Sequence, residues 1–124
     1  MPASAKTRVE VYIPDRRSDP SYRRTLDWIA DEFTFVRAGG ASIIEGIDGR
    51  YLSTSHRTTI YEGISVIYSD FPSDWSNDHE RNEVINYLED LKLFAEDVLW
   101  QEETILVLAY PVFHITSTVI PSVI

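Results

Sequence analysis

The chain has 124 residues, the size of one domain, so we treat residues 1–124 as a single domain with a compact core over residues 7–115 and an apolar tail over residues 116–124. Its 20 Asp and Glu outnumber 11 Lys and Arg, giving a net charge of −9. This balance argues against a general nucleic-acid-binding protein, because Lys and Arg supply most of the affinity for phosphates. The absence of cysteine excludes disulfides, thiolate metal sites and cysteine nucleophiles.

The N-terminal residues contain no apolar segment of the kind found in secretory signals. The longest mostly apolar stretch, Ile105–Ile115, has about half the length needed to cross a bilayer. We therefore expect a soluble, cytoplasmic protein that makes no membrane contact.

The negative charge is concentrated in the second half of the chain. Residues 1–60 contain nine basic and eight acidic residues, whereas residues 61–124 contain two and twelve. Most of this acidic excess is explained by the solvent face of one helix and its capping loop. The basic counterpart is a group of four arginines around the expected start of the first helix, which is where we would look first for a ligand: Arg16, Arg17, Arg23 and Arg24.

The first two elements are a strand and a helix. Apolar and polar residues alternate over Arg8–Ile13, which is typical of a half-buried strand. Asp19 and Pro20 form a helix start, with Asp as the N-cap and Pro at the first helical position. Apolar residues follow on one helical face at positions 22, 26, 29 and 33, and the Gly39-Gly40 pair marks the helix end.

The next segment predicts a hairpin. Ala41–Ser53 is expected to form a strand with a bulge near residues 46–49, where two glycines interrupt it. A polar connection over residues 54–59 leads into a second strand, Ile60–Ser69.

A second helix and a last strand complete the pattern. Asn77 and Glu80 have the spacing of a capping box, and apolar residues recur at positions 84, 88, 91, 95 and 98. Thr104–Tyr110 is short, apolar and β-branched, so we expect a strand that is buried on both faces.

The resulting order β-α-β-β-α-β resembles the ferredoxin-like arrangement, an α+β fold with a four-stranded antiparallel sheet and two helices on one face. The run from Gly39 to Tyr51 also resembles small bacterial proteins of this architecture whose function is uncharacterised. The resemblance is architectural and implies no activity, because this fold hosts many unrelated functions. The RNA-binding version of the fold is disfavoured, since the expected third strand carries Glu62 and no basic residue.

One end of such a sheet collects the first strand–helix loop and the hairpin loop. These loops contain the candidate ligand-binding residues Arg16, Arg17, His56 and Arg57. Arginine side chains beside free backbone amides favour a small anionic ligand. The alternative is a pair of solvated loops whose arginines contact Glu102 and Glu103.

The opposite end collects an acidic loop and the end of the last strand. Asp70, Asp74, Asp78 and His79 offer metal-type ligands, but their spacing matches no calcium loop, and acidic residues are expected at a helix start in any case. We therefore predict no metal and no cofactor.

His114 is a candidate general base in a pocket near Arg37, with His56 as a second candidate. The competing interpretation of His114 is a strand-end histidine that is hydrogen-bonded to the backbone.

Apolar residues on both sides of the last strand would leave an apolar patch on the open sheet face. We therefore predict a homo-oligomer, most simply a homodimer, that assembles through this face and acts as a non-catalytic small-molecule-binding or regulatory module. One alternative is a small enzyme whose pocket lies at the oligomer interface and uses a His as proton carrier, with Arg37 or Arg57 as the residue that binds an anion. Another is an acidic module that binds a basic protein partner.

Overall fold

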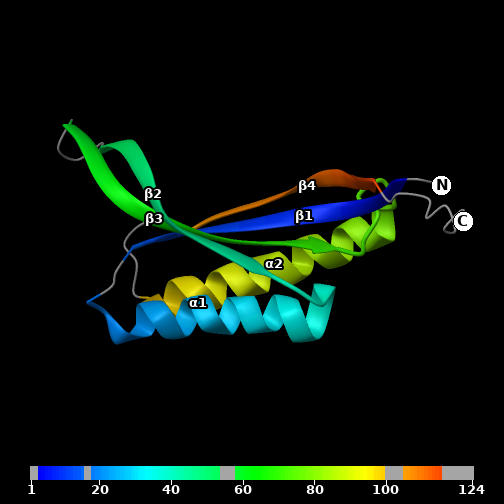
Figure 1. Cartoon of the computed structure of the whole chain (residues 1–124), viewed down its shortest axis with the longest axis horizontal. Coiled ribbons are helices and arrows are strands. Elements are labelled where there is room, and N and C mark those ends of the chain that lie inside the picture. The colour runs from blue at the N-terminus through cyan, green and yellow to red at the C-terminus, as the bar shows by residue number, and fades with distance from the viewer. Residues whose placement is uncertain (1–2, 16–17, 54–57, 100–104, 116–124) are drawn as a thin grey trace, which may run out of the picture.

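The computed structural model describes residues 3–15, 18–53, 58–99 and 105–115. Its elements in chain order are β1 (Ala3–Pro14), α1 (Pro20–Glu32), the π-helical segment η1 (Phe33–Ala38), β2 (Ser42–Ser53), β3 (Thr58–Phe71), α2 (Asp78–Leu99) and β4 (Leu106–Ile115). The strands form one antiparallel sheet in the order β2-β3-β1-β4. Both helices cover the same face of this sheet and leave the other face open (Figure 1).

This topology is the ferredoxin-like fold, so the predicted fold class is confirmed. The central strand β1 pairs with β3 on one side and β4 on the other, and β2 and β4 form the two edges. Of the helices in the described ranges, none is long and apolar enough to cross a membrane.

The core lies between the sheet and the helices. The predicted alternation along β1 is confirmed, because Val9, Val11 and Ile13 are fully buried against the helical layer. The first helix contributes Leu26 and Ile29, which are also fully buried. Burial of each such side chain contributes about 1.5–3 kcal/mol to folding, so this interface holds the two layers together.

The helix starts follow the predicted caps. The Asp19 Oδ1 atom accepts a hydrogen bond of 2.8 Å from the Ser21 amide at the start of α1. At the start of α2 the Glu80 amide donates to Asn77 Oδ1 over 3.1 Å. Each of these bonds satisfies a backbone donor that would otherwise lack a partner in the first helical turn.

The exit from the first helix is also as predicted. The π-helical turn ends at Gly39, whose φ of +77° lies in the left-handed region that favours glycine. Gly46 has the same φ and lies in the bulge that shifts the β2–β3 register between Ile44 and Ile47. The two glycines therefore set how β2 leaves the helix and how it bends.

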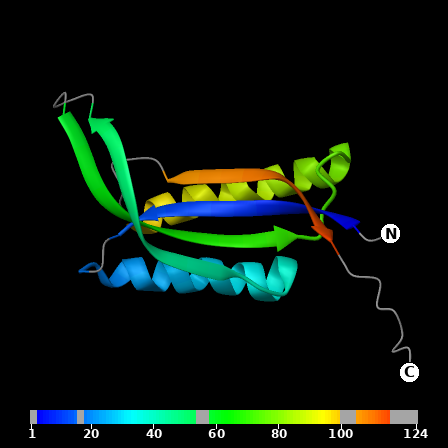
Figure 2. The same ribbon diagram turned by 45° about the horizontal axis from the view of Figure 1, so that its top comes forward.

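The bulge precedes a two-stranded ribbon that leaves the body of the molecule. The pairing of β1 with β3 ends at Pro14 and Ile64, whereas β2 and β3 remain paired as far as Ser53 and Thr58. The far part of the hairpin therefore pairs with no third strand among the described residues, and it projects from the rest of the fold (Figures 1 and 2).

The expectation that the last strand is buried on both faces is wrong. Because β4 is an edge strand and the helices cover only one face, its side chains alternate between half-buried and exposed. Val107 and Ala109 pack against the core, while Leu106 and Leu108 on the other face are 50% and 38% exposed. An unbroken apolar run does not show whether both faces of a strand are covered.

Two adjacent glycines test the backbone requirement at the helix exit. Gly39→Ala is expected to lower the free energy of unfolding by about 1–2 kcal/mol, because alanine is strained at φ +77° even though open space surrounds the position. Gly40→Ala is the matched control, since Gly40 also has open space but lies outside the left-handed region, and we expect little change. Urea unfolding measures both, and equal effects would contradict the conformational explanation.

Candidate functional site on the open sheet face

The open face of the sheet carries a group of polar side chains from its three neighbouring strands β3, β1 and β4. Because Val9 and Val11 point toward the helices, the residues that alternate with them, Arg8 and Glu10, lie on the open face. The strand register places Arg8 opposite Asp70 of β3 and opposite Tyr110 of β4. Side chains that are 62 and 102 positions from Arg8 in the sequence are thereby brought beside it.

Asp70 is the centre of this group. Arg8 Nε donates to Asp70 Oδ1 over 2.7 Å, and Arg8 Nη2 donates to Oδ2 over 2.9 Å, which is a two-pronged charged pair. The Nε2 atom of His114 lies 2.6 Å from the same Oδ2. The hydrogen bonds from Arg8 in the first place, and from His114 in the second, lower the pKa of Asp70 from 3.8 to about 2.

A second carboxylate orders the tyrosines beside it. Glu10 accepts hydrogen bonds from the Tyr12 hydroxyl over 2.8 Å and from the Tyr110 hydroxyl over 2.6 Å. These bonds are the main reason why the pKa values of both tyrosines are raised. The Arg8 guanidinium also lies 5.4 Å from the centre of the Tyr68 ring, within cation–π range. We call the group the Asp70 cluster: Arg8, Glu10, Tyr12, Tyr68, Asp70, Tyr110 and His114.

The chemistry available to the cluster centres on His114. An ionised carboxylate can only accept hydrogen bonds, so a neutral His114 donates its Nε2–H to Asp70 and keeps the Nδ1 lone pair. The His114 side chain is 42% exposed, whereas that of Asp70 is only 15% exposed. A ligand arriving on the open face therefore reaches the imidazole more readily than the carboxylate that orients it.

The sequence-predicted site residues have different outcomes. Arg16, Arg17, His56 and Arg57 lie outside the described residues. The guanidinium of Arg37 lies 4.0 Å from the centre of the Tyr87 ring, on the helical side of the sheet. His114 lies on the open face, so the structure does not bring it together with Arg37.

The acidic loop has local partners instead of a shared ligand. Asp74 accepts hydrogen bonds from the Ser76 amide and hydroxyl, Asp78 pairs with Arg81 at 2.6 Å, and His79 lies 3.2 Å from Glu83. Within the described residues there is no group of three or more His, Asp or Glu side chains that could hold a metal ion.

Sequence reasoning placed Asp70 and the end of the last strand at one end of the sheet but missed Arg8 and Glu10. The signal was present, because both are charged residues on the polar side of an alternating strand. What could not be read was the register that sets Arg8 opposite Asp70.

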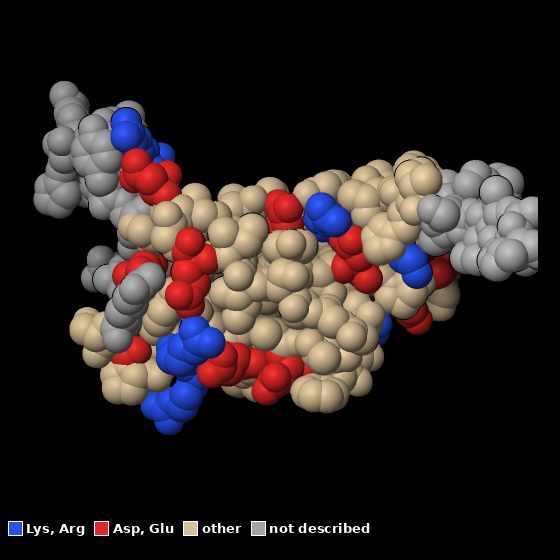
Figure 3. Space-filling view, in the orientation of Figure 1, with Lys and Arg blue, Asp and Glu red and all other residues tan. Residues whose placement is uncertain are grey.

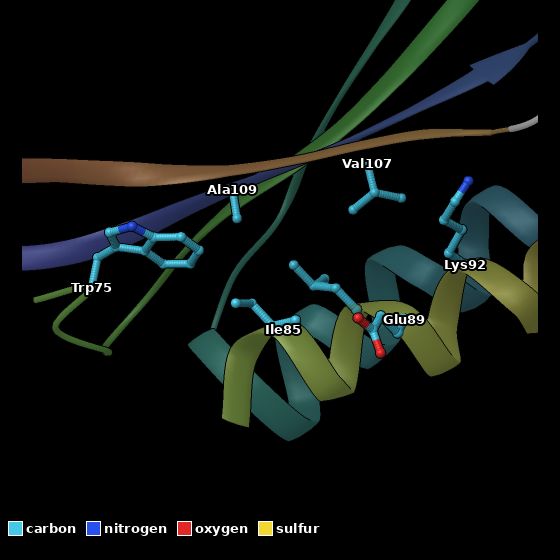
Figure 4. A pocket seen from close by; sticks show the side chains of 7 residues that line it. Trp75, Ile85, Glu89, Lys92, Val107 and Ala109 are labelled. Atoms are coloured by element: carbon cyan, nitrogen blue, oxygen red, sulfur yellow. The ribbon is translucent and has the colours of Figure 1, made fainter. Parts of the chain in front are cut away.

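A separate apolar hollow of about 230 Å³ lies between β4 and α2 (Figure 4). Val107 and Ala109 of β4 face it from one side, and Ile85 and Lys92 of α2 from the other. Lys92 Nζ donates to the Ile105 carbonyl over 2.7 Å and to Glu96 over 3.2 Å. These bonds hold the ammonium group near the start of β4.

No family model matches the chain, and no curated protein matches it. Solved structures with the same fold include CutA1 from Oryza sativa, which is 15% identical over 90% of this chain and 84% of that one, with a TM-score of 0.52. A divalent cation tolerance protein (Cut A1) from Thermus thermophilus is 12% identical over 87% and 84%, with a TM-score of 0.51. A phage SAM lyase in complex with S-methyl-5′-thioadenosine is 13% identical over 91% and 84%, with a TM-score of 0.55. At these identities the similarity shows the ferredoxin-like fold alone.

The low pKa of Asp70 predicts a dependence of stability on pH. A carboxyl group whose pKa is lower in the folded state contributes stability above its unfolded value near 3.8 and loses it as the pH falls through about 2. The stability gap between the native protein and Asp70→Asn is therefore expected to shrink by about 1 kcal/mol between pH 7 and pH 2, a figure reduced for partial exposure.

Urea unfolding at the two pH values measures this gap. Asp31→Asn is the control, since Asp31 is an exposed carboxylate with no hydrogen bond or ion pair among the described residues. A gap for Asp70→Asn that stays constant with pH would show that Asp70 is not held ionised by Arg8 and His114.

Proposed function

We propose that the protein is a non-catalytic small-molecule-binding or regulatory module that assembles with further copies of itself through the open sheet face. The observation that carries the proposal is the mixed character of this face. It combines the Asp70 cluster with exposed apolar side chains on both edge strands, among them Leu106 at 50% and Ile44 at 48% exposed. Exposed apolar surface next to an ordered polar group is typical of an interface.

A second copy is the partner that best fits this face. No third strand pairs with the projecting ribbon of β2 and β3 among the described residues, and an isolated two-stranded hairpin is only marginally stable in water. In the part of the chain that the structure describes, the ribbon is thus not supported by a further strand and the open sheet face is not covered by a further element. If the ribbon of one copy packs on the open face of another, the same contact stabilises the ribbon and buries the apolar side chains.

Covering the open face would also create the ligand site. On a single chain the Asp70 cluster lies on an open surface, where water competes for every polar contact. A second copy would enclose His114 and Tyr110 and lower the local dielectric constant, which strengthens hydrogen bonds to a bound ligand. The proposal therefore links ligand binding to assembly.

The small-enzyme alternative keeps one specific observation in its favour. The contact of 2.6 Å between His114 Nε2 and Asp70 orients the imidazole as a carboxylate orients the general base of many enzymes. Because a phage SAM lyase has the same fold, S-adenosylmethionine is the compound with which to distinguish the enzyme from the binding module. After incubation, nuclear magnetic resonance would detect S-methyl-5′-thioadenosine as a product. Formation of this product that His114→Gln abolishes would favour the enzyme, and binding without turnover favours the module.

Leu106→Glu tests the assembly. We expect the native protein to have a mass in solution that is a multiple of 14.3 kDa, and the variant to run as a monomer because it places a charge within the apolar interface. Leu93→Glu is the matched control, since Leu93 is 66% exposed but lies on α2, away from the open face. Size-exclusion chromatography with light scattering measures the masses, and circular dichroism checks the fold. A native monomer at high concentration would overturn the proposed assembly.

A further inference from the structure

The outer surface of the helical layer contains a hollow that the proposed function does not use. It lies between α1 and α2 and has a volume of about 400 Å³. Its lining residues within the described ranges all belong to the two helices: Ser21, Arg24, Thr25, Trp28, Phe94 and Val98. Since none of the described strand residues lines it, the hollow is separated from the open sheet face by the helices and the sheet.

Two aromatic rings form the apolar part of the hollow. The ring centres of Trp28 and Phe94 are 4.4 Å apart, and their planes are inclined by 39°. The two side chains are nevertheless 37% and 46% exposed, so both rings still present surface to the hollow. Such a pair is a stacking surface for a planar apolar group.

Arg24 provides a positive charge beside these rings. Its one hydrogen bond within the described ranges runs from Nε to the Pro20 carbonyl over 3.4 Å, which is long for such a bond. The neighbouring Arg23 is different, because it pairs with Asp27 at 3.2 Å and with Glu45 at 2.9 Å. Figure 3 shows basic side chains beside acidic ones over this part of α1. Arg24 thus has no carboxylate partner among the described residues, whereas Arg23 has two.

Thr25 supplies a buried polar group. Its side chain lines the hollow and the residue is only 3% exposed, yet Oγ1 has no hydrogen-bond partner among the described residues. Thr34, which lies in η1, donates a hydrogen bond from its hydroxyl to the Ala30 carbonyl over 2.7 Å. A helical threonine in this protein can therefore hydrogen-bond to the backbone carbonyl four residues earlier. A buried hydroxyl without a partner is unfavourable, and rotation of χ1 would turn it toward a polar atom in the hollow.

We propose that this hollow is a binding site for a small aromatic carboxylic acid. The ring of the acid would stack on Trp28 and Phe94, its carboxylate would pair with Arg24, and Thr25 would donate a hydrogen bond to a carboxylate oxygen. The three features select this class together. A neutral hydrocarbon would form no charged pair with Arg24 and no hydrogen bond with Thr25, and a sugar phosphate would not stack on the rings.

The test is a titration of the full chain with 2-naphthoate, followed by amide chemical shifts in nuclear magnetic resonance. We expect saturable shifts in α1 and α2 and a dissociation constant of about 1 mM, the affinity range of a small ligand that buries one ring. The neutral analogue 2-naphthamide has the same ring and nearly the same shape. It should bind about tenfold more weakly, since it cannot form the charged pair with Arg24.

Variants of two adjacent arginines test the contribution of the Arg24 charge to binding. Arg24→Gln should weaken 2-naphthoate about tenfold and leave 2-naphthamide within about twofold, so that the two ligands bind alike. Arg23→Gln is the matched control, and it should leave the preference for the carboxylate intact. Thr25→Val keeps the side-chain shape, and a further loss of affinity for 2-naphthoate is expected. Equal effects of the two arginine variants would overturn the proposal.

Two further outcomes would also overturn it. One is the absence of saturable shifts in α1 and α2. The other is a lower mass in solution for Trp28→Ala than for the native protein, since the aromatic pair would then be a contact between copies. The monomeric Leu106→Glu variant is expected to bind 2-naphthoate with unchanged affinity. The failure of this site and the failure of the proposed assembly are therefore distinguishable.

Discussion

The structure depends on the alternation of side chains along the central strand β1. Val9, Val11 and Ile13 hold the helices against one face of the sheet, while Arg8 and Glu10 project from the other. A shift of one residue in this strand would exchange the two sets, bury the charges and expose the core. One strand thus fixes both the hydrophobic core and the polar cluster, and its two neighbours complete each of them.

Coverage of only one sheet face explains the other unusual features of the molecule. The helices leave β4 as a half-exposed edge strand and leave the Asp70 cluster open. Arg8 uses two nitrogens on Asp70, so the cluster is ordered before any ligand arrives. Such an arrangement favours specific recognition on the open face once a second layer covers it, because the groups that bind are already in place.

The helical layer supplies a second and chemically different surface. Its hollow combines an aromatic pair with Arg24 and with the Thr25 hydroxyl, which has no hydrogen-bond partner among the described residues. The open sheet face combines ion pairs with aliphatic side chains. If both proposals hold, one small domain binds an acid on its helices and a copy of itself on its sheet. The core between the two surfaces would be the physical route for any coupling between them.

The sequence by itself determined the elements and their order, because caps, glycines and alternation are local signals. The Asp19 and Asn77 caps, the helix end at Gly39 and the buried side of β1 were all predicted from neighbouring residues and are confirmed. Only the tertiary structure decided which face of β4 is covered. It also decided that Arg8 and His114 both contact the carboxylate of Asp70. Strand register and edge position join residues that are far apart in the chain, and no local pattern encodes such pairings.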